Sequence, residues 1–167
     1  MLEIFRTSLL TDHPPEKLHL IISTIGDQRW ITLEVSDSRG SNQSEAPARR
    51  LTLPLSLWPL FYEAVCCLGS FMKPLPAPAY QATSCCSCLC PPSPEPVVLE
   101  QADQQQIHLS LQDRRGSTFL EIKTVSPAEN SSGEAAPILI SPTCWSAFLS
   151  AVQRLDQLTT DLGFQAY

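Results

Sequence analysis

Two stretches of the chain decide its fold: LTLPLSLWPLFYEAV at residues 51–65 and ILISPTCWSAFLSAV at residues 138–152. Each stretch places a short β-forming run before a tryptophan, and an apolar pattern with helical spacing follows. Trp58 and Trp145 lie 87 positions apart, and the same offset pairs the Phe, Ala and Val that follow them. A match over this many positions predicts an internal duplication.

The same offset, followed toward the N-terminus without a gap, matches further apolar positions. It places Leu20–Ser23 on Ile107–Ser110 and Leu33–Val35 on Leu120–Ile122. We therefore predict that residues 20–65 and 107–152 are two copies of one unit.

Both copies show the same order of elements. In the first copy we expect strands at 17–24, 29–35 and 50–53, a turn at 25–28, a loop at 37–48 and a helix at 57–71. In the second copy we expect strands at 106–111, 118–123 and 137–140, a turn at 112–116, a loop at 126–136 and a helix at 142–161 with Ser141 as its N-cap. Residues 2–10 and 97–100 each add a further strand.

This pattern predicts an α+β fold of two tandem strand-rich repeats, each with about four antiparallel strands and one helix, in one pseudo-two-fold domain. A single small sheet cannot cover its own apolar face, so the two repeats are expected to pack together and share a core. We assign residues 1–72 to the first repeat and 97–167 to the second. Residues 73–96 are rich in proline, which prevents both a helix and a ladder, so we expect an exposed Pro/Cys-rich linker there.

Composition limits the classes of function. The formal net charge is −6, and an acidic surface disfavours a strong non-specific nucleic-acid binder. No run of about 18 apolar residues is present, so we expect no membrane span and no membrane partner. The N-terminal sequence lacks the basic-then-apolar order of a signal peptide. We therefore expect a cytoplasmic protein with largely reduced cysteines.

A cysteine tract, CCSCLC at residues 85–90, leaves two interpretations open. Cys85, Cys88 and Cys90 are weak candidates for binding a soft metal or for redox chemistry. A structural zinc site usually needs two separated pairs, and no second C-x-x-C is present. An unstructured cysteine-bearing loop is the alternative that we favour, so we predict neither a metal nor a cofactor.

The sequence carries no pattern typical of an enzyme. It lacks a Gly-rich phosphate loop and a G-x-S-x-G nucleophile turn. His13, His19 and His108 are not at metal-ligand spacing, and His19 and His108 do not align at the offset of 87. We expect these histidines to be strand residues rather than catalytic bases and predict a protein without catalytic residues.

The two units resemble the repeat of the purine-rich-element-binding (PUR) proteins, and they are also similar to the single-stranded-DNA-binding transcriptional coactivator and Whirly families. Residues 107–125 and 51–65 carry most of the resemblance, which covers both copies. It implies two intertwined repeats of four antiparallel strands and a helix, with single-stranded DNA or RNA bound on the exposed sheet face. Longer PUR proteins dimerise through a further repeat. This chain has no third copy, and its sequence leaves open whether it is a monomer or a homodimer.

Strand alternation gives candidate residues for this chemistry. Because Leu33 and Leu120 are expected to face inward, Trp30 and Phe119 should face outward, where they would stack on bases or else pack into the core between the repeats. Basic residues at strand ends and loops are candidate phosphate contacts: Arg29, Arg49, Arg50, Arg114, Arg115 and Lys123.

Two hypotheses of function follow. The first is a single-stranded DNA- or RNA-binding protein that acts in transcription or RNA handling. Glu34 and Glu121 occupy equivalent positions at the offset of 87, and we expect them on the binding face, where carboxylates would weaken the approach of phosphates. The alternative is therefore an acidic protein-interaction or assembly module that has lost nucleic-acid binding.

Overall fold

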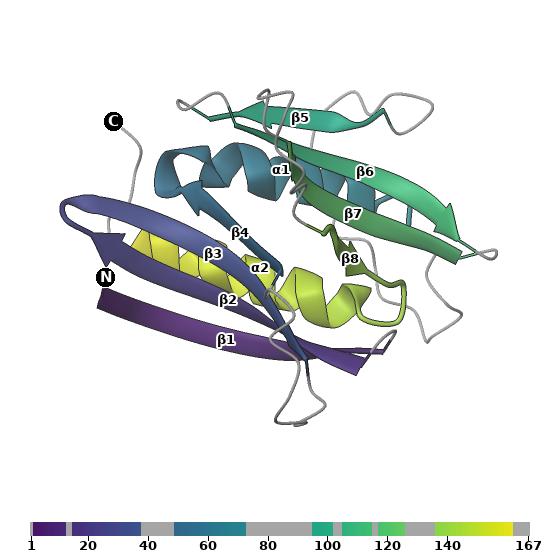
Figure 1. The fold of residues 1–167 in the computed structure, drawn as a ribbon, viewed down its shortest axis with the longest axis horizontal. Helices are drawn as coiled ribbons and strands as arrows, with labels where there is room; N and C mark the ends of the chain where they lie inside the picture. Colours follow the sequence, from purple (N-terminus) through teal and green to yellow (C-terminus); the bar gives the residue numbers. More distant parts are fainter. Residues whose placement is uncertain are drawn as a thin grey trace.

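Each half of the chain forms one four-stranded antiparallel sheet followed by one helix (Figure 1). The computed structural model describes residues 2–12, 15–37, 49–72, 95–101, 105–114, 117–125 and 136–161. The first half contains β1 (Leu2–Asp12), β2 (Pro15–Ile25), β3 (Gln28–Asp37), β4 (Arg49–Pro54), a 3₁₀ turn (Leu55–Leu57) and α1 (Trp58–Gly69). The second contains β5 (Val97–Glu100), β6 (Gln106–Arg114), β7 (Ser117–Val125), β8 (Ile138–Ile140) and α2 (Trp145–Asp161). The α+β class and the duplicated arrangement of strands and helices are confirmed.

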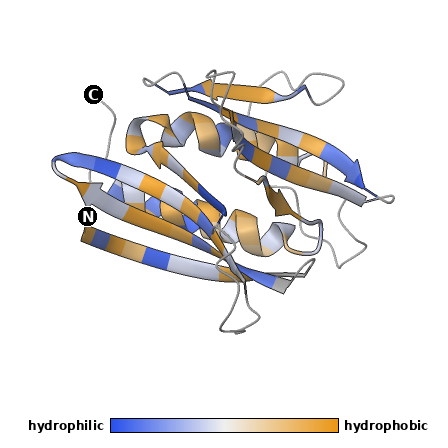
Figure 2. Ribbon diagram, in the orientation of Figure 1, coloured by the Kyte–Doolittle hydropathy of each residue, from blue (hydrophilic) through white to orange (hydrophobic). Residues whose placement is uncertain are grey.

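The alternation of residue types explains the strands. Along β2 and β3 every second side chain is apolar and buried, and most of the side chains between them are polar, a pattern that Figure 2 shows as alternating colours. Ile21 and Trp30 are the exceptions. Gly26 and Asp27 connect these strands in a two-residue turn, in which Ile25 pairs with Gln28. Gly26 has φ +61°, a conformation that glycine adopts without steric cost, so the sequence sets this turn locally.

The strand pairing corrects the constant offset of 87. Ile25 pairs with Gln28 at the first hairpin turn, and Arg114 pairs with Ser117 at the second, which places the two hairpins 89 positions apart. The offset of 87 holds for the last strand and the helix of each repeat. Leu33 pairs with Leu51, and Ile122, its equivalent at the offset of 89, pairs with Ile138, which is 87 positions after Leu51. In the structure, Leu33 therefore matches Ile122 and not Leu120. The difference of two residues falls between β3 and β4 in one repeat and between β7 and β8 in the other.

The helices are exchanged between the repeats. The α1 helix packs against β5 and β6 of the second sheet, and α2 packs against β1 of the first (Figure 1). A single hydrophobic cluster contains buried residues from both sheets and both helices, including Leu33, Phe61, Leu120 and Phe148. Because each sheet is covered by the helix of the other repeat, the core belongs to both repeats at once.

The two helices also contact each other, through residues related by the offset of 87. Trp58 at the start of α1 is buried and donates its indole Nε1–H to Asp156 Oδ1 of α2 at 3.1 Å. In the other half, the ring of Trp145 lies on Gly69 so closely that a Cβ at position 69 would be 1.9 Å from Trp145 Cζ2. Asp156 and Gly69 are themselves 87 positions apart.

Several expected elements lie slightly differently in the structure. The second helix begins at Trp145 rather than residue 142, because Pro142–Cys144 form a turn. Ser141 nevertheless acts as expected of a cap, since its Oγ accepts the Cys144 N–H at 3.4 Å. The expected linker at 73–96 and the loops at 37–48 and 126–136 lie almost wholly outside the described residues. Within the described part, no helix is long and apolar enough to cross a membrane.

Candidate nucleic-acid interface

Each sheet has an outer face, which we define as the face turned away from the helices. In the first sheet this face carries Trp30, Thr32 and Glu34 of β3, whereas Leu33 faces the core. In the second it carries Phe119, Glu121 and Lys123 of β7. The side-chain directions predicted from strand alternation are therefore correct.

Trp30 and Phe119 occupy equivalent positions in the two hairpins, at the structural offset of 89. Both side chains are half-buried, and neither belongs to the hydrophobic cluster that the two repeats share. Of the two sequence-based interpretations, packing into the shared core does not hold. Each outer face thus has one partly accessible aromatic ring at the same place, the kind of group on which a base stacks.

Trp30 is packed close to the surface of its sheet and is half-buried. It pairs with Ser23 of β2, whose side chain is only 1 % exposed, and with Pro54 of β4. Its indole Nε1 is buried and finds no hydrogen-bond acceptor among the described residues. A buried donor without a partner typically costs about 1–3 kcal/mol. The ring is therefore half-buried, and its polar edge is turned away from water.

Two candidate arginines lie on the outer faces, and each has a glutamate beside it. Arg114 Nη2 is 3.5 Å from Glu121 Oε2, and Arg50 Nε is 4.0 Å from Glu34 Oε2. The arginine side chains are about half exposed (50 % and 46 %). Exposed pairs of this kind hold together weakly, by about 0–1 kcal/mol.

Arg49 is placed differently from the other candidates. Its side chain is 21 % exposed, forms an ion pair with Glu16 of β2 and donates to the backbone oxygen of Pro137 at 3.2 Å. The second bond reaches the chain just before β8, so Arg49 links the two repeats. A guanidinium with these two partners is better suited to a structural role than to phosphate contact.

The remaining candidates are spread over both sheets. Lys123 is half-buried on the outer face of the second sheet, opposite His108. Arg29 is exposed, opposite Thr24 and close to the first hairpin turn. Arg115 lies outside the described residues. The structure thus brings Arg114, Lys123 and Phe119 together on one face, with Arg50 and Trp30 on the other.

The expected equivalence of Glu34 and Glu121 is wrong. At the structural offset of 89, Glu34 corresponds to Lys123 and Glu121 corresponds to Thr32. Thr32 and Glu121 are 1 % and 8 % exposed, so this position is buried on both outer faces. The carboxylates therefore do not form a repeated acidic feature, and the first sheet has an acid where the second has a base.

The sequence alignment also missed an equivalent pair of histidines. His19 of β2 and His108 of β6 are 89 positions apart and both lie on the outer face. His19 pairs with Glu34, and His108 pairs with Lys123. His19 Nε2 is 3.1 Å from Ser36 Oγ, and His108 Nε2 is 3.1 Å from Gln106 Oε1. The common pattern apolar–His–apolar would have revealed the pair if the two sequences had been aligned on their turns.

The outer face of the first sheet continues onto β1 with a balanced pair of charges. Arg6 donates to both carboxylate oxygens of Glu3, the shortest contact being 2.8 Å from Nη2 to Oε2. These hydrogen bonds from Arg6 lower the pKa of Glu3 below its ordinary value. The positive charge of Arg6 is thus largely balanced by the carboxylate of Glu3.

The metal hypothesis cannot be placed on the structure. Cys85, Cys88 and Cys90 lie outside the described residues. Among the residues that are described, no group of three or more His, Cys, Asp or Glu side chains is arranged to hold a metal ion. The described Cys144 is buried, and its thiol donates to the backbone oxygen of Leu10 at 3.5 Å.

Comparison with known proteins adds no family to this geometry. Neither a scan of protein-family models nor a search of curated proteins finds a match for the chain.

Proposed function

We propose that the protein binds single-stranded DNA or RNA on the outer faces of its sheets, and acts through this binding in transcription or RNA handling. The observation that carries the proposal is the repeated aromatic position: Trp30 and Phe119 lie outside the shared core, at equivalent places on the outer faces of the two sheets. Base stacking on such rings contributes about 1–3 kcal/mol per base and tolerates any sequence. The resemblance to PUR repeats implies the same use of these faces.

The second sheet provides the better surface. Phe119 lies between Arg114 toward the hairpin turn and Lys123 toward the far end of β7, all on one face. Arg114 is half exposed, and Glu121 is its one ion-pair partner among the described residues, with Oε2 3.5 Å from Arg114 Nη2. A phosphate can replace that weak contact at little cost, because an exposed ion pair contributes about 0–1 kcal/mol. Two cations flanking an aromatic ring suit a short stretch of backbone with one stacked base.

Fluorescence anisotropy with a labelled oligothymidine, at low and moderate salt, tests the proposal. Wild-type protein should bind in the micromolar range, and its affinity should fall as salt rises. Phe119→Ala should weaken binding about tenfold, and the double variant Arg114→Ala/Lys123→Ala should reduce the salt slope by about 1.4, since each contact on single strands contributes about 0.7.

Arg154→Ala is the matched control, because Arg154 is an exposed arginine of α2 on the helix side of the molecule. It removes one positive charge away from the outer faces and should leave both the affinity and the salt slope near wild type. The absence of binding at low salt, or an effect of Arg154→Ala as large as that of Arg114→Ala/Lys123→Ala, would contradict the proposal.

A specific observation favours a second function, a protein-interaction or assembly module. Each of the candidate arginines 49, 50 and 114 has a glutamate within ion-pair distance, which reduces the positive potential available to phosphates. Glu34→Gln separates the two functions. If the face binds nucleic acid, removing this carboxylate beside Arg50 should tighten binding, and if the face has lost that role, the variant should bind no better than wild type.

A further inference from the structure

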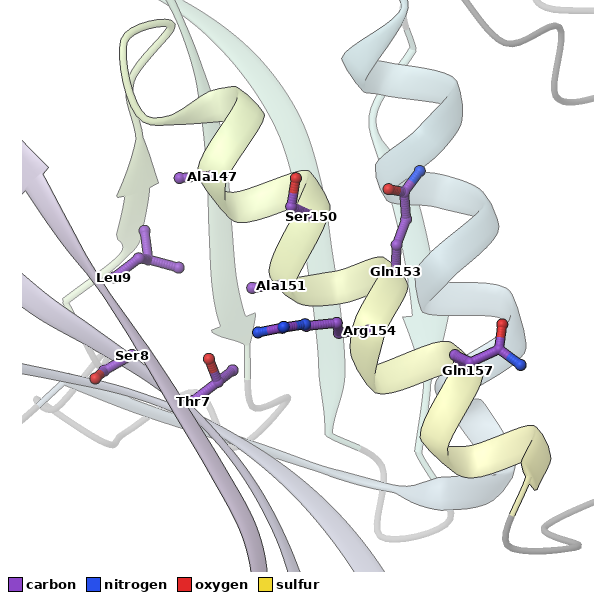
Figure 3. A pocket seen from close by; sticks show the side chains of 9 residues that line it. All are labelled: Thr7, Ser8, Leu9, Ala147, Ser150, Ala151, Gln153, Arg154 and Gln157. Carbon is purple, nitrogen blue, oxygen red and sulfur yellow. The ribbon is translucent and has the colours of Figure 1, made fainter.

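A groove runs between β1 and α2, at the edge of the first sheet. It has a volume of about 540 Å³, within the range of ligand-binding pockets. From β1 it is lined by Thr7, Ser8 and Leu9, and from α2 by small or polar side chains and Arg154 (Figure 3). The proposed nucleic-acid interface uses none of these residues.

One wall of the groove is the edge strand of the first sheet. The strand order is β1-β2-β3-β4, so β1 pairs with β2 on one side and with no described strand on the other. Exposed edges of this length invite a further strand, and proteins usually protect them with charges, proline or bulges. Here the irregular register lies between Glu3 and Phe5, and the Glu3–Arg6 ion pair lies beside it. Thr7–Leu9, which line the groove, lie after both the irregular register and the ion pair in the strand.

The other wall supplies one cation and no acid. Arg154 extends from α2 across the groove toward Thr7 (Figure 3). Its guanidinium has no carboxylate within 4.0 Å among the described residues, and no acidic side chain lines the groove. The cations of the outer faces differ, since three of them have a glutamate partner. A cation left open beside hydroxyl and amide groups is complementary to a carboxylate ligand.

The second half of the molecule does not repeat the small side chains and the cation of this groove. At the equivalent place in the second half, Val98 of β5 corresponds to Ser8, and Cys67 of α1 corresponds to Arg154. Leu60 of α1, at the position of Ala147, is 52 % exposed there. The same backbone arrangement thus carries larger apolar side chains in one half and small polar ones with a cation in the other, so the chemistry is particular to the groove between β1 and α2.

We infer that this groove is the docking site for an extended acidic peptide of a partner protein. The peptide adds to the edge of β1 as a fifth strand, and its backbone pairs with that of Thr7–Leu9. Side chains that alternate toward α2 enter the groove, where small residues such as Ala147 and Ala151 leave room. An aspartate or glutamate among them forms an ion pair with Arg154, which sets the preference for acidic segments.

Selection from a displayed library of random decapeptides on the immobilised full chain tests this inference. Wild type should enrich β-forming peptides with an acidic residue at a fixed position. Arg154→Glu should lose these peptides, with at least about a tenfold loss of affinity, and should select a basic residue at that position instead. Arg114→Glu makes the same charge change on the outer face of the second sheet, and it should select the same peptides as wild type.

Amide hydrogen exchange then locates the bound peptide. A synthetic copy of the enriched sequence should slow exchange in β1 between Thr7 and Leu10 and leave β5 unchanged, and thermal melting should show that Arg154→Glu remains folded. The inference is overturned if wild type and Arg154→Glu enrich the same peptides, if neither enriches any, or if protection falls outside β1. A dimer in light scattering that dissociates when Thr7–Leu9 are altered would assign the edge to a second copy of the chain and overturn it as well.

Discussion

The two helix junctions are the same contact made with different side chains. In each, a tryptophan at the start of one helix meets a residue of the other helix. The Trp–Phe ring pair within each helix has a similar centroid distance, 5.6 Å for Trp58–Phe61 and 5.8 Å for Trp145–Phe148, with interplanar angles of 26° and 46°. Trp58 meets Asp156, which accepts its indole N–H, whereas Trp145 lies directly on Gly69. Duplication kept the geometry of the junction and let its chemistry diverge, so one side depends on a hydrogen bond and the other on the absence of a side chain.

The largest difference between the junctions should appear when each tryptophan is removed. Trp58→Ala should lower the free energy of unfolding by about 3–5 kcal/mol, because the ring is 1 % exposed and its loss leaves a cavity in the shared core. Trp145→Ala should cost less, because that ring is only partly buried. Urea titration followed by circular dichroism measures both values, and equal losses would show that the two junctions contribute alike.

A smaller loss should follow from adding one methyl group at the second junction. Gly69→Ala should destabilise by about 1–3 kcal/mol, because the new Cβ overlaps the Trp145 ring, although alanine by itself favours a helix by about 1 kcal/mol. The double variant Gly69→Ala/Trp145→Ala should be more stable than the sum of the single losses predicts. Strictly additive losses in this cycle would mean that the close contact carries no strain.

The smallest effect should come from the acceptor at the first junction. Asp156→Ala should cost about 1–2 kcal/mol, because the buried indole N–H of Trp58 loses its partner. Asp156→Asn keeps an oxygen in the same place and should remain close to wild type. The fluorescence emission of Trp58 and the unfolding midpoint check this prediction, which fails if the two variants are equally destabilised.

The class of fold and most of the elements could be predicted from the sequence, but the offset of 87 aligned the two hairpins with each other wrongly by two residues. A strand alternates with a period of two, so a shift of two keeps every side chain on its face and the apolar pattern cannot detect it. The prediction that Leu33 and Leu120 face inward was therefore correct even though they are not equivalent. The ends of the hairpins carried the missing information, because the pairs Ile25–Gln28 and Arg114–Ser117 fix the register of each hairpin.

The candidate site was predicted less completely than the fold. Trp30 and Phe119 could be placed on outer faces because alternation decides the direction of a side chain. The partners of the arginines could not be predicted, since Glu16 and Arg49 meet only when β2 and β4 are in one sheet, and Pro137 reaches Arg49 only across the two repeats. Contacts between residues so far apart in the chain leave no periodic signal in the sequence.

Because the helices are exchanged, each helix packs on a sheet that is synthesised at a different time, and this affects folding during translation. The first sheet and α1 are synthesised before β5 and β6, against which α1 packs. β6 ends at Arg114, about 45 residues beyond the end of α1, which corresponds to a delay of roughly 2–9 s at ordinary elongation rates. During that interval the apolar side of α1 lacks the sheet on which it packs in the folded protein. The first sheet lacks its covering helix for longer, because α2 is synthesised last. The nascent protein is therefore most open to chaperones, and to premature pairing with other copies, in the middle of its own synthesis.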